Sequence, residues 1–403
     1  MASAVLTPLP SASSPPRTAA ARLQSIDALR GLVIVFMLLD HVRETFYLHA
    51  QVADPMDVAA TPAALFFSRL LAHVCAPVFV LLTGLSAFLY ASRQDGGRAA
   101  ASAFLFKRGL VLVLLELTLV NFAWTFQFPP AKIYLQVIWA IGLSMLALSA
   151  LVWLPRAVLV AVGVLLVAGH NLLDGLHFAP GHALHLPWAI LHDRGWIVVS
   201  DALRLRTSYP VLPWIGVIAL GYAAGPWFKG EVAPARRQRA LLATGLGLIA
   251  GFAALRALNV YGDTPWQAGA TALASTMSFL NITKYPPSLL FLLLTLGIGL
   301  LCLFALERLQ QRHGGRLPPA AAWLMAFGAA PMFFYLLHLY VLKFLYLAAV
   351  SIWGLNHGDY FGFDSVGAVW LGMLVLAAAL YAPVKAFAAF KARRRDIAWL
   401  KYL

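Results

Sequence analysis

The chain has 403 residues, of which 61% are hydrophobic and 11% are charged, with a mean hydropathy of +0.79. A soluble domain carries about 25% charged residues, so the composition excludes an ordinary soluble protein and predicts a chain that crosses the lipid bilayer several times. The formal net charge of +14 does not indicate nucleic-acid binding, because no basic stretch in a soluble segment is interleaved with base-stacking aromatic residues.

The chain divides into a short tail and a long apolar part. Residues 1–21 are rich in Ser, Pro and Ala and lack the apolar run of a signal peptide, so they are predicted to form a disordered cytoplasmic tail. Residues 22–403 are predicted to form one all-α domain, a polytopic membrane helical bundle of about ten transmembrane helices. The predicted spans are 28–48, 63–91, 106–127, 133–153, 156–170, 211–228, 240–259, 286–306, 322–347 and 366–390.

The basic residues predict how these spans are oriented. Most of the 30 Lys and Arg residues fall at every second connection between the spans. Cytoplasmic loops collect Lys and Arg, so this alternation puts both termini in the cytoplasm. The external side then receives three long loops, at 49–62, 170–210 and 260–285. Binding and catalytic residues are frequent in such loops.

The first predicted span carries more ionisable residues than a membrane helix normally has. Arg30 lies near its start, Asp40, His41 and Glu44 lie at mid-membrane or beyond, and His49 lies near the external boundary. His41 is about 16 Å farther along the helix than Arg30. Charged groups within a span are costly and indicate a functional site. The plain alternative for His41 is a hydrogen-bonded packing residue.

Polar residues of other spans reach a similar depth. They lie in the external halves of their spans or in the adjoining external segments, whereas the cytoplasmic halves are almost entirely Leu, Val and Ala. We therefore expect one cavity that is open to the exterior. The candidate substrate-binding residues are His73, Asn121, Asn281, Lys284, Tyr285 and His338. For Lys284 the plain alternative is an ammonium group that reaches the membrane interface.

A histidine with carboxylate neighbours in a polar cavity suits general-base catalysis, and it suits the proton relay of a transporter equally well. The chain has no Gly-rich phosphate loop and no nucleophile elbow, and its loop histidines lack the spacing of a metal site. Two alternatives to an enzyme remain, a proton-coupled transporter or flippase for a small envelope metabolite and a non-catalytic scaffold. A scaffold does not explain why costly polar groups share one depth.

Six sequence patterns occur together in this chain, at 25–31 (SIDALRG), 37–41 (MLLDH), 73–84 (HVCAPVFVLLTG), 209–216 (YPVLPWIG), 281–288 (NITKYPPS) and 333–338 (FFYLLH). Together they resemble the catalytic domain of heparan-alpha-glucosaminide N-acetyltransferase and, more closely, its bacterial relatives. The resemblance covers nearly all of the chain after the tail. The combination is more specific than the first-span pattern, which other membrane acyltransferases share.

The resemblance implies acetyl transfer from acetyl-CoA, approached from the cytosol, to an amine or hydroxyl of an external sugar. It puts Asp40 where the family has a site asparagine. It also matches His49, with a gap of about two residues, to the catalytic histidine that follows the first span. From the residues themselves we rank His41 first as the general base and His49 second, with Asp40 or Glu44 orienting the imidazole.

The remaining candidates serve the two substrates. Lys284 and Asn281 are candidate donors to a developing oxyanion or to the sugar. Arg30, Lys107 and Arg108 are candidate ligands for the CoA phosphates, and the plain alternative for the last two is a topology signal. The resemblance implies a multi-pass protein of the bacterial inner membrane. A homodimer is a further expectation.

Overall fold

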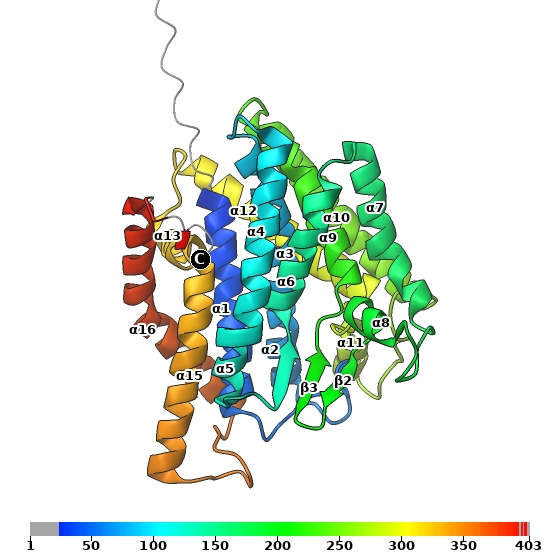
Figure 1. Cartoon of the computed structure of the whole chain (residues 1–403), viewed down its shortest axis with the longest axis vertical. Helices are drawn as coiled ribbons and strands as arrows, with labels where there is room; N and C mark the ends of the chain where they lie inside the picture. The colour runs from blue at the N-terminus through cyan, green and yellow to red at the C-terminus, as the bar shows by residue number, and fades with distance from the viewer. Residues whose placement is uncertain (1–23, 395, 398, 401–403) are drawn as a thin grey trace, which may run out of the picture.

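The computed structural model describes residues 24–394, 396, 397, 399 and 400. The predicted tail, residues 1–21, lies outside the described residues. The described chain is mainly helical, and its long helices run roughly along one axis (Figure 1).

The first half of the chain contains α1 (Gln24–Phe46), α2 (Ala63–Ala72), α3 (Cys75–Ala91), α4 (Gly97–Leu115), a π-helical turn (Glu116–Val120), α5 (Asn121–Thr125), α6 (Val137–Leu151), α7 (Arg156–Gly169), a 3-10 turn (His170–Leu173) and α8 (His185–Leu191). The second half contains α9 (Leu212–Ala224), a 3-10 turn (Gly225–Phe228), α10 (Pro234–Leu258), α11 (Ala272–Leu280), α12 (Leu289–Arg312), α13 (Pro319–Ala322), α14 (Leu324–Ala329), α15 (Pro331–Trp353) and α16 (Val366–Arg393).

Six described helical segments are long and apolar enough to cross a membrane. They are Ala63–Ala91, Arg156–Leu173, Pro234–Leu258, Leu289–Arg312, Pro331–Trp353 and Val366–Arg393. Shorter apolar helices occupy Val137–Leu151, Leu212–Phe228 and Pro319–Ala329. The prediction of a helical, integral membrane protein is thereby confirmed, whereas the count of about ten spans and the cytoplasmic side of both termini stay predictions.

A small three-stranded sheet corrects the prediction of an all-α chain. Its strands are β1 (Lys132–Leu135), β2 (Gly195–Ser200) and β3 (Leu203–Thr207), in the order β1-β3-β2. β1 is parallel and β2 is antiparallel to β3. The sequence prediction puts β1 at the start of the span 133–153, because its apolar residues run into those of α6. It puts the other two strands in the loop 170–210.

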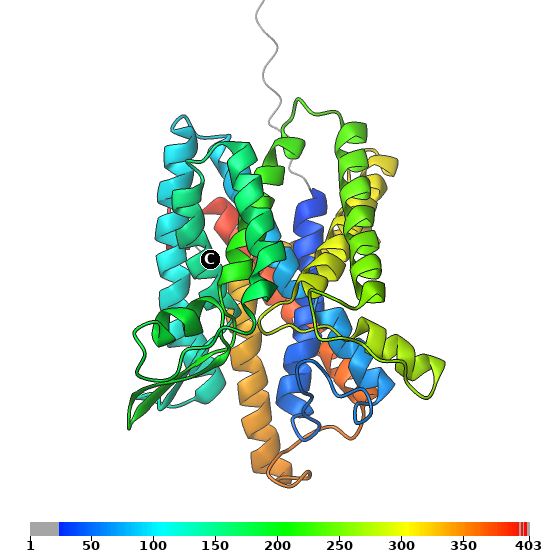
Figure 2. The same cartoon turned by 90° about the vertical axis from the view of Figure 1, so that its right-hand side faces the viewer.

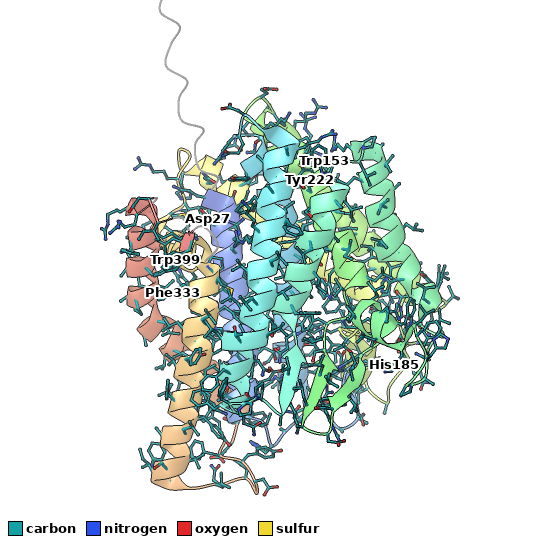
Figure 3. All side chains as sticks on the ribbon, in the orientation of Figure 1. Asp27, Trp153, His185, Tyr222, Phe333 and Trp399 are labelled. Atoms are coloured by element: carbon teal, nitrogen blue, oxygen red, sulfur yellow. The ribbon has the colours of Figure 1, made fainter. Side chains whose placement is uncertain are left out.

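The bundle has two distinct ends. We call the end where α1 begins, and where the connections 92–96, 152–155 and 229–233 lie, the basic end, and the opposite end the sheet end (Figure 1). Asp27 and Trp153 lie toward the basic end and His185 toward the sheet end (Figure 3). Turned by 90°, the bundle shows α1 in its middle, with helices on both sides (Figure 2).

Close helix crossings hold α1 in this central position. A Cβ atom on Gly31 of α1 would lie 1.9 Å from the carbonyl oxygen of Leu324, and one on Gly328 of α14 would lie 1.8 Å from that of Asp27. Only glycine permits this approach of two backbones. Lipid tails are as apolar as leucine, so membrane helices associate largely through such close packing of small residues. α1 is thereby fixed beside the functional site described next.

Candidate active site

A cavity of about 790 Å³ runs beside α1. Its lining along this helix begins at Asp27 and ends at Glu44, which corresponds to roughly 26 Å of helix. The hydrocarbon core of a bilayer is about 30 Å thick. The cavity therefore extends from the basic end to the sheet end. Its walls come mainly from α1, α3, α4, α6 and α15, and from the strands and loops of the sheet end.

His41 lines this cavity and is hydrogen-bonded to His338 of α15. The His41 Nδ1 lies 2.6 Å from the His338 Nε2, and the two rings stack at a centroid distance of 4.9 Å. The His338 Nδ1 lies 2.7 Å from the carbonyl oxygen of Phe334, which can only accept. In the neutral pair His338 therefore donates through Nδ1 and accepts the Nδ1–H of His41. This leaves the His41 Nε2 with a free lone pair, as a general base requires.

Two aromatic donors flank the His41 ring. Trp124 and Tyr335 meet it edge-on, at centroid distances of 5.4 and 5.9 Å. Both the Trp124 Nε1 and the Tyr335 hydroxyl are buried; they interact with each other, but neither meets the distance and angle of a hydrogen bond with a described residue. A buried donor without a partner costs about 1–3 kcal/mol. Tyr335 also lines the cavity.

Asp40 is surrounded by cations. Its Oδ1 lies 2.9 Å from the Arg43 Nε and 3.7 Å from an Arg69 terminal nitrogen, and its Oδ2 lies 3.8 Å from the Lys284 ammonium. Glu44 accepts another bond from Arg43, at 3.0 Å. Buried charges are tolerated when they are paired in this way. Asp40 therefore holds Arg43, Arg69 and Lys284 at the cavity wall.

We predicted that Asp40 or Glu44 orients the His41 ring, but the ring is bonded to a different residue. Within the described part of the chain, no hydrogen bond joins the His41 ring to Asp40 or Glu44. Both carboxylates are bonded to Arg43 instead. The structure therefore gives His338, which we predicted as a substrate-binding residue, the geometry of an orienting partner for His41.

The segment 281–288 brings Lys284 to the cavity, and two partly buried carboxylates, Asp54 and Asp263, hold it there. Asp54 accepts the backbone N–H of Lys284 at 3.2 Å. Asp263 accepts both the backbone N–H and the hydroxyl of Thr283, at 2.9 and 2.6 Å. Burial raises the pKa of the Asp54 carboxyl, although nearby cations oppose the rise. The position of Lys284 is thus fixed by the loop itself, which argues against an ammonium that merely reaches the membrane interface.

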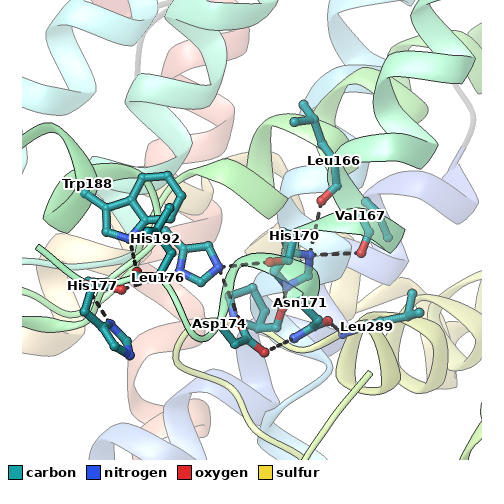
Figure 4. Close-up of polar contacts among 12 residues, drawn as sticks. Leu166, Val167, His170, Asn171, Asp174, Leu176, His177, Trp188, His192 and Leu289 are labelled. Atoms are coloured by element: carbon teal, nitrogen blue, oxygen red, sulfur yellow. Dashed lines mark hydrogen bonds and ion pairs between the residues drawn. The ribbon is translucent and has the colours of Figure 1, made fainter. Parts of the chain in front are cut away.

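A polar cluster of the loop 170–210 contacts the same segment (Figure 4), and its residues do not line the cavity. His170 Nε2 lies 2.8 Å from a backbone carbonyl of the segment, and Asn171 accepts the first backbone N–H of α12 at 2.9 Å. His192 Nε2 lies 3.3 Å from Asp174. Burial opposes the charge on His192, but its hydrogen bonds to Asp174 and to the His170 carbonyl raise its pKa overall. These loop histidines therefore have a structural role.

Cations also line the cavity at the basic end. Arg30 pairs with Asp27 at 3.0 Å, and Arg108 and Lys391 face the same space. The Arg108 Nε is buried, and no described residue accepts a hydrogen bond from it. Sequence reasoning missed Lys391, because it belongs to a basic stretch after the last span that reads as a topology signal.

Aromatic rings accompany these cations. Tyr90 and Phe104 stack at a centroid distance of 4.5 Å and both line the cavity. The Arg108 guanidinium lies 5.8 Å from the Phe104 ring centre. Stacked rings beside a group of cations suit a nucleotide, whose base stacks and whose phosphates accept charge-assisted hydrogen bonds. The residues present at the basic end therefore fit the nucleotide part of CoA.

Six residues that we predicted in the site lie outside the cavity lining, and one of them, His338, reaches it only through its hydrogen bond to His41. Asn121 bonds the edge of β1 through the Lys132 carbonyl and the Tyr134 N–H, both at 3.1 Å. Asn281 bonds both backbone groups of Met56, at 3.0 and 2.6 Å. These two asparagines hold loops in place. The other three are His73, Lys107 and His49.

Each of these three has its own environment. His73 is fully buried, and neither of its ring nitrogens has a hydrogen-bond partner among the described residues. Lys107 is exposed on α4, one position before the cavity residue Arg108. His49 stacks on His357 at a centroid distance of 3.7 Å. The side chain of His49 is therefore turned toward the loop after α15 rather than toward the cavity.

Sequence reasoning missed several cavity residues that had a signal. Arg69 is a lone basic residue within the apolar span 63–91, which is itself a sign of function. Tyr335 lies three positions before His338, so the two share a helix face. Arg194 and Arg206 fall in the long predicted loop 170–210, so neither stands out as a charge within an apolar span. No described group of three or more His, Cys, Asp or Glu residues is arranged to hold a metal ion.

The fold and the cavity together define an integral membrane protein whose bundle encloses a cavity lined by ionisable residues. The model of one family, described as heparan-alpha-glucosaminide N-acetyltransferase, catalytic, matches residues 22–261. This is more than half of the chain, and the chain belongs to that family of membrane acetyltransferases. No curated protein matched the chain. The matched range includes Asp40 and His41, whereas Lys284 and Tyr335, which line the same cavity, and His338, which is bonded to His41, lie beyond it.

Proposed function

We propose that the protein transfers an acetyl group from acetyl-CoA, bound at the basic end, to an amine or hydroxyl of a sugar bound at the sheet end. The observation that carries this proposal is the position of His41. It lines a cavity that extends to both ends, and its Nδ1–H is bonded to His338. The basic connections favour a cytoplasmic basic end. The sheet end would then face the exterior of a bacterial plasma membrane.

The donor would enter at the basic end. Acetyl-CoA supplies an activated acetyl thioester. Arg30, Arg108 and Lys391 would hold its phosphates, and the stacked rings of Tyr90 and Phe104 would accept its adenine. The unpartnered Nε of Arg108 supports this assignment, because a phosphate oxygen would satisfy it.

His41 would act as the general base. Its Nε2 takes a proton from the acceptor amine or hydroxyl as that group attacks the thioester carbonyl, and it returns the proton to the departing sulfur. A new N–C or O–C bond forms, the C–S bond breaks, and CoA leaves as the thiol. His338 accepts the Nδ1–H of His41 throughout, which keeps the imidazole oriented.

The negative charge that develops on the carbonyl oxygen needs donors. Tyr335 and Lys284 both line the cavity with His41, and the hydroxyl of Tyr335 makes no hydrogen bond of good geometry with a described residue. Donors that are already in place when the charge develops lower the barrier most. We therefore give Tyr335 and Lys284 the role that the sequence suggested for Lys284 and Asn281.

The acetyl group passes either directly to the acceptor or first to the His41 Nε2, which is also a nucleophile. Incubation of the protein with labelled acetyl-CoA alone separates the two routes. The second route predicts an acetylated protein whose label is lost on addition of acceptor, and the first predicts no protein-bound label.

The proposal is tested with purified protein, labelled acetyl-CoA and a panel of amino sugars and neutral sugars. Wild type is expected to acetylate at least one of them, and His41→Ala is expected to acetylate it at least about 100-fold more slowly. If wild type transfers label to no member of the panel, and deletion of the gene leaves the acetylation of the cell envelope unchanged, the proposal is wrong for those acceptors.

A proton-coupled transporter is the second candidate, because a cavity that extends to both ends also suits transport. The break between α14 and α15 lines this cavity, at Ala329 and Pro331, and transporters often bind their substrates at broken helices. Uptake of an envelope sugar into proteoliposomes under an imposed pH gradient, without acetylation, would favour this candidate.

A further inference from the structure

The small sheet has two unlike faces. Its even-numbered residues include Tyr134 on β1, Trp196 on β2 and Arg206 on β3, whereas the odd-numbered face is apolar and buries Leu135 and Ile197. Alternate side chains of a strand point to opposite sides, so the even-numbered residues form one aromatic and basic face. We call Tyr134, Arg194, Trp196 and Arg206 the sheet platform.

The strand register brings these side chains together. Arg206 of the central strand pairs with Tyr134 on one side and with Trp196 on the other. Its guanidinium lies 5.2 Å from the Trp196 ring centre, and the rings of Tyr134 and Trp196 lie 6.0 Å apart. Arg194 precedes β2, two positions before Trp196, so it is a diagonal neighbour of Arg206 at roughly 7–8 Å.

The platform opens into the cavity that contains His41. Tyr134, Arg194 and Arg206 line this cavity, as do Gln136 and Ser208, the next even-numbered positions inward. The platform is therefore a continuous extension of the proposed active site, and a molecule lying on it can reach His41 through the same space.

The two arginines of the platform form no close ion pair with a described residue. Within the described part of the chain, no hydrogen bond or ion pair is made by the guanidinium of Arg194 or Arg206, and aromatic rings lie against both. Asp54, whose carboxylate is already bonded to the Lys284 backbone, acts on Arg194 only through space. Arg194 lies 4.7 Å from the ring centre of Tyr285. Deeper in the cavity the cations are paired. Arg43, Arg69 and Lys284 lie within 3.8 Å of Asp40, and Arg43 also contacts Glu44.

Topology does not explain these arginines. Lys and Arg that orient a membrane protein collect on its cytoplasmic side, which we take to be the basic end. Arg194 and Arg206 lie at the opposite end, within the cavity lining. A guanidinium is a fork of donors that matches carboxylate and phosphate oxygens.

We propose that the sheet platform binds an anionic group of the sugar acceptor, a carboxylate or a phosphate, through Arg194 and Arg206, while Trp196 and Tyr134 pack against the sugar ring. This inference rests on the proposed function in taking the acceptor to be a sugar. It adds that the acceptor is charged and that its specificity is determined by the sheet.

The test measures binding without turnover. Purified full-length protein, saturated with CoA so that the basic end is occupied, is titrated calorimetrically with three sugar amines that differ at carbon 6. They are glucosamine, glucosamine 6-phosphate and 2-amino-2-deoxyglucuronic acid. At least one charged amine is expected to bind ten times more tightly than glucosamine, and the stronger of the two identifies the anion as phosphate or carboxylate.

Variants locate this preference on the sheet. Arg194→Gln/Arg206→Gln is expected to reduce the preference to less than twofold. Arg204→Gln is the matched control, because Arg204 lies on the same face of β3, one step farther out, and does not line the cavity; it is expected to keep the preference. If the double variant unfolds, Arg194→Gln alone replaces it, because that side chain is exposed.

Three results would overturn the inference: charged amines that bind no more tightly than glucosamine, a preference that survives loss of the platform arginines, or an equal loss in Arg204→Gln. Because the measurement requires no acetyl transfer, failure of the proposed enzyme activity leaves it intact. A charged amine that binds as expected but is never acetylated would contradict the proposed function instead.

Discussion

The two ends of the cavity are built from similar chemical groups on different scaffolds. At the basic end, Arg30 and Arg108 project from α1 and α4, close to stacked aromatic rings. At the sheet end, Arg194 and Arg206 project from strands and loops, again against aromatic rings. Helices of a packed bundle fix their side chains firmly, whereas loops and short strands can change in sequence without disturbing the bundle.

This difference suits an enzyme that uses a common donor and a particular acceptor. The donor is recognised by the rigid part of the molecule, and the acceptor by the part that can vary. His41 lies between the two ends and belongs to α1, which close glycine crossings hold in place. The following substitutions test this division of roles.

The largest effect is expected at the point where the two ends meet. His41→Ala removes the proposed general base, and acetyl transfer should fall by about 10²–10⁴-fold. Initial rates with labelled acetyl-CoA measure this loss. His49→Ala is the matched control, because His49 packs on His357 outside the cavity, and it should change the rate less than threefold. A His49→Ala loss as large as that of His41→Ala would reverse our ranking of the two histidines.

The orienting role of His338 predicts a smaller and more selective effect. His338→Ala should lower kcat by about 10–100-fold with little change in the KM for acetyl-CoA, because the residue acts through His41 and touches neither end of the cavity. His338→Gln should recover part of kcat, since its side-chain oxygen can accept the Nδ1–H of His41.

A purely structural role of His338 would give a different pattern. In that case the alanine and glutamine variants would lose kcat equally, and their pH–rate profiles would keep the shape of the wild-type profile. Thermal unfolding of both variants shows whether loss of folded protein accounts for the decrease.

The basic end is tested through donor affinity. Arg108→Gln removes a guanidinium whose Nε has no partner in the described structure, and it should raise the KM for acetyl-CoA about tenfold with kcat changed less than threefold. Lys107→Gln removes the neighbouring charge from an exposed position outside the cavity, and its KM should remain that of wild type. An equal change in both variants would indicate a general effect of surface charge.

The smallest effect is expected from the polar cluster of the loop 170–210. The fold raises the pKa of His192 and lowers that of Asp174. Their contact therefore contributes its full stabilisation at pH values that lie above the pKa of Asp174 in the unfolded chain and below the pKa of His192 in the unfolded chain. The difference in Tm between wild type and Asp174→Asn should therefore be largest between about pH 4 and 6.5. It should decline as the pH rises through the folded pKa of His192. A difference that grows up to pH 9 would contradict this assignment.

The sequence predicted the membrane bundle and several of its cavity residues for a physical reason. Charged groups within an apolar span are costly, so Arg30, Asp40, His41 and Glu44 stood out on α1. The structure brings these four residues together along one cavity. Their catalytic and binding roles stay predictions.

The rest depended on contacts that a sequence does not reveal. Asn121 and Asn281 resemble substrate ligands in the sequence but bond backbone groups distant in the chain. The hydrogen-bond partner of the His41 ring is 297 positions away. The strands β2 and β3 did have a signal, since Leu203–Thr207 alternates apolar and basic residues in the pattern of a half-buried strand. The same alternation places Arg206 on the cavity face.

Transfer between the two ends is the central claim, and a sided assay tests it most directly. The protein is reconstituted into sealed vesicles that contain the acceptor identified in the panel, and labelled acetyl-CoA is added only outside. We predict labelled product inside the vesicles with wild type and at least about 100-fold slower formation with His41→Ala. Product that forms only when donor and acceptor are on the same side of the membrane would contradict the account.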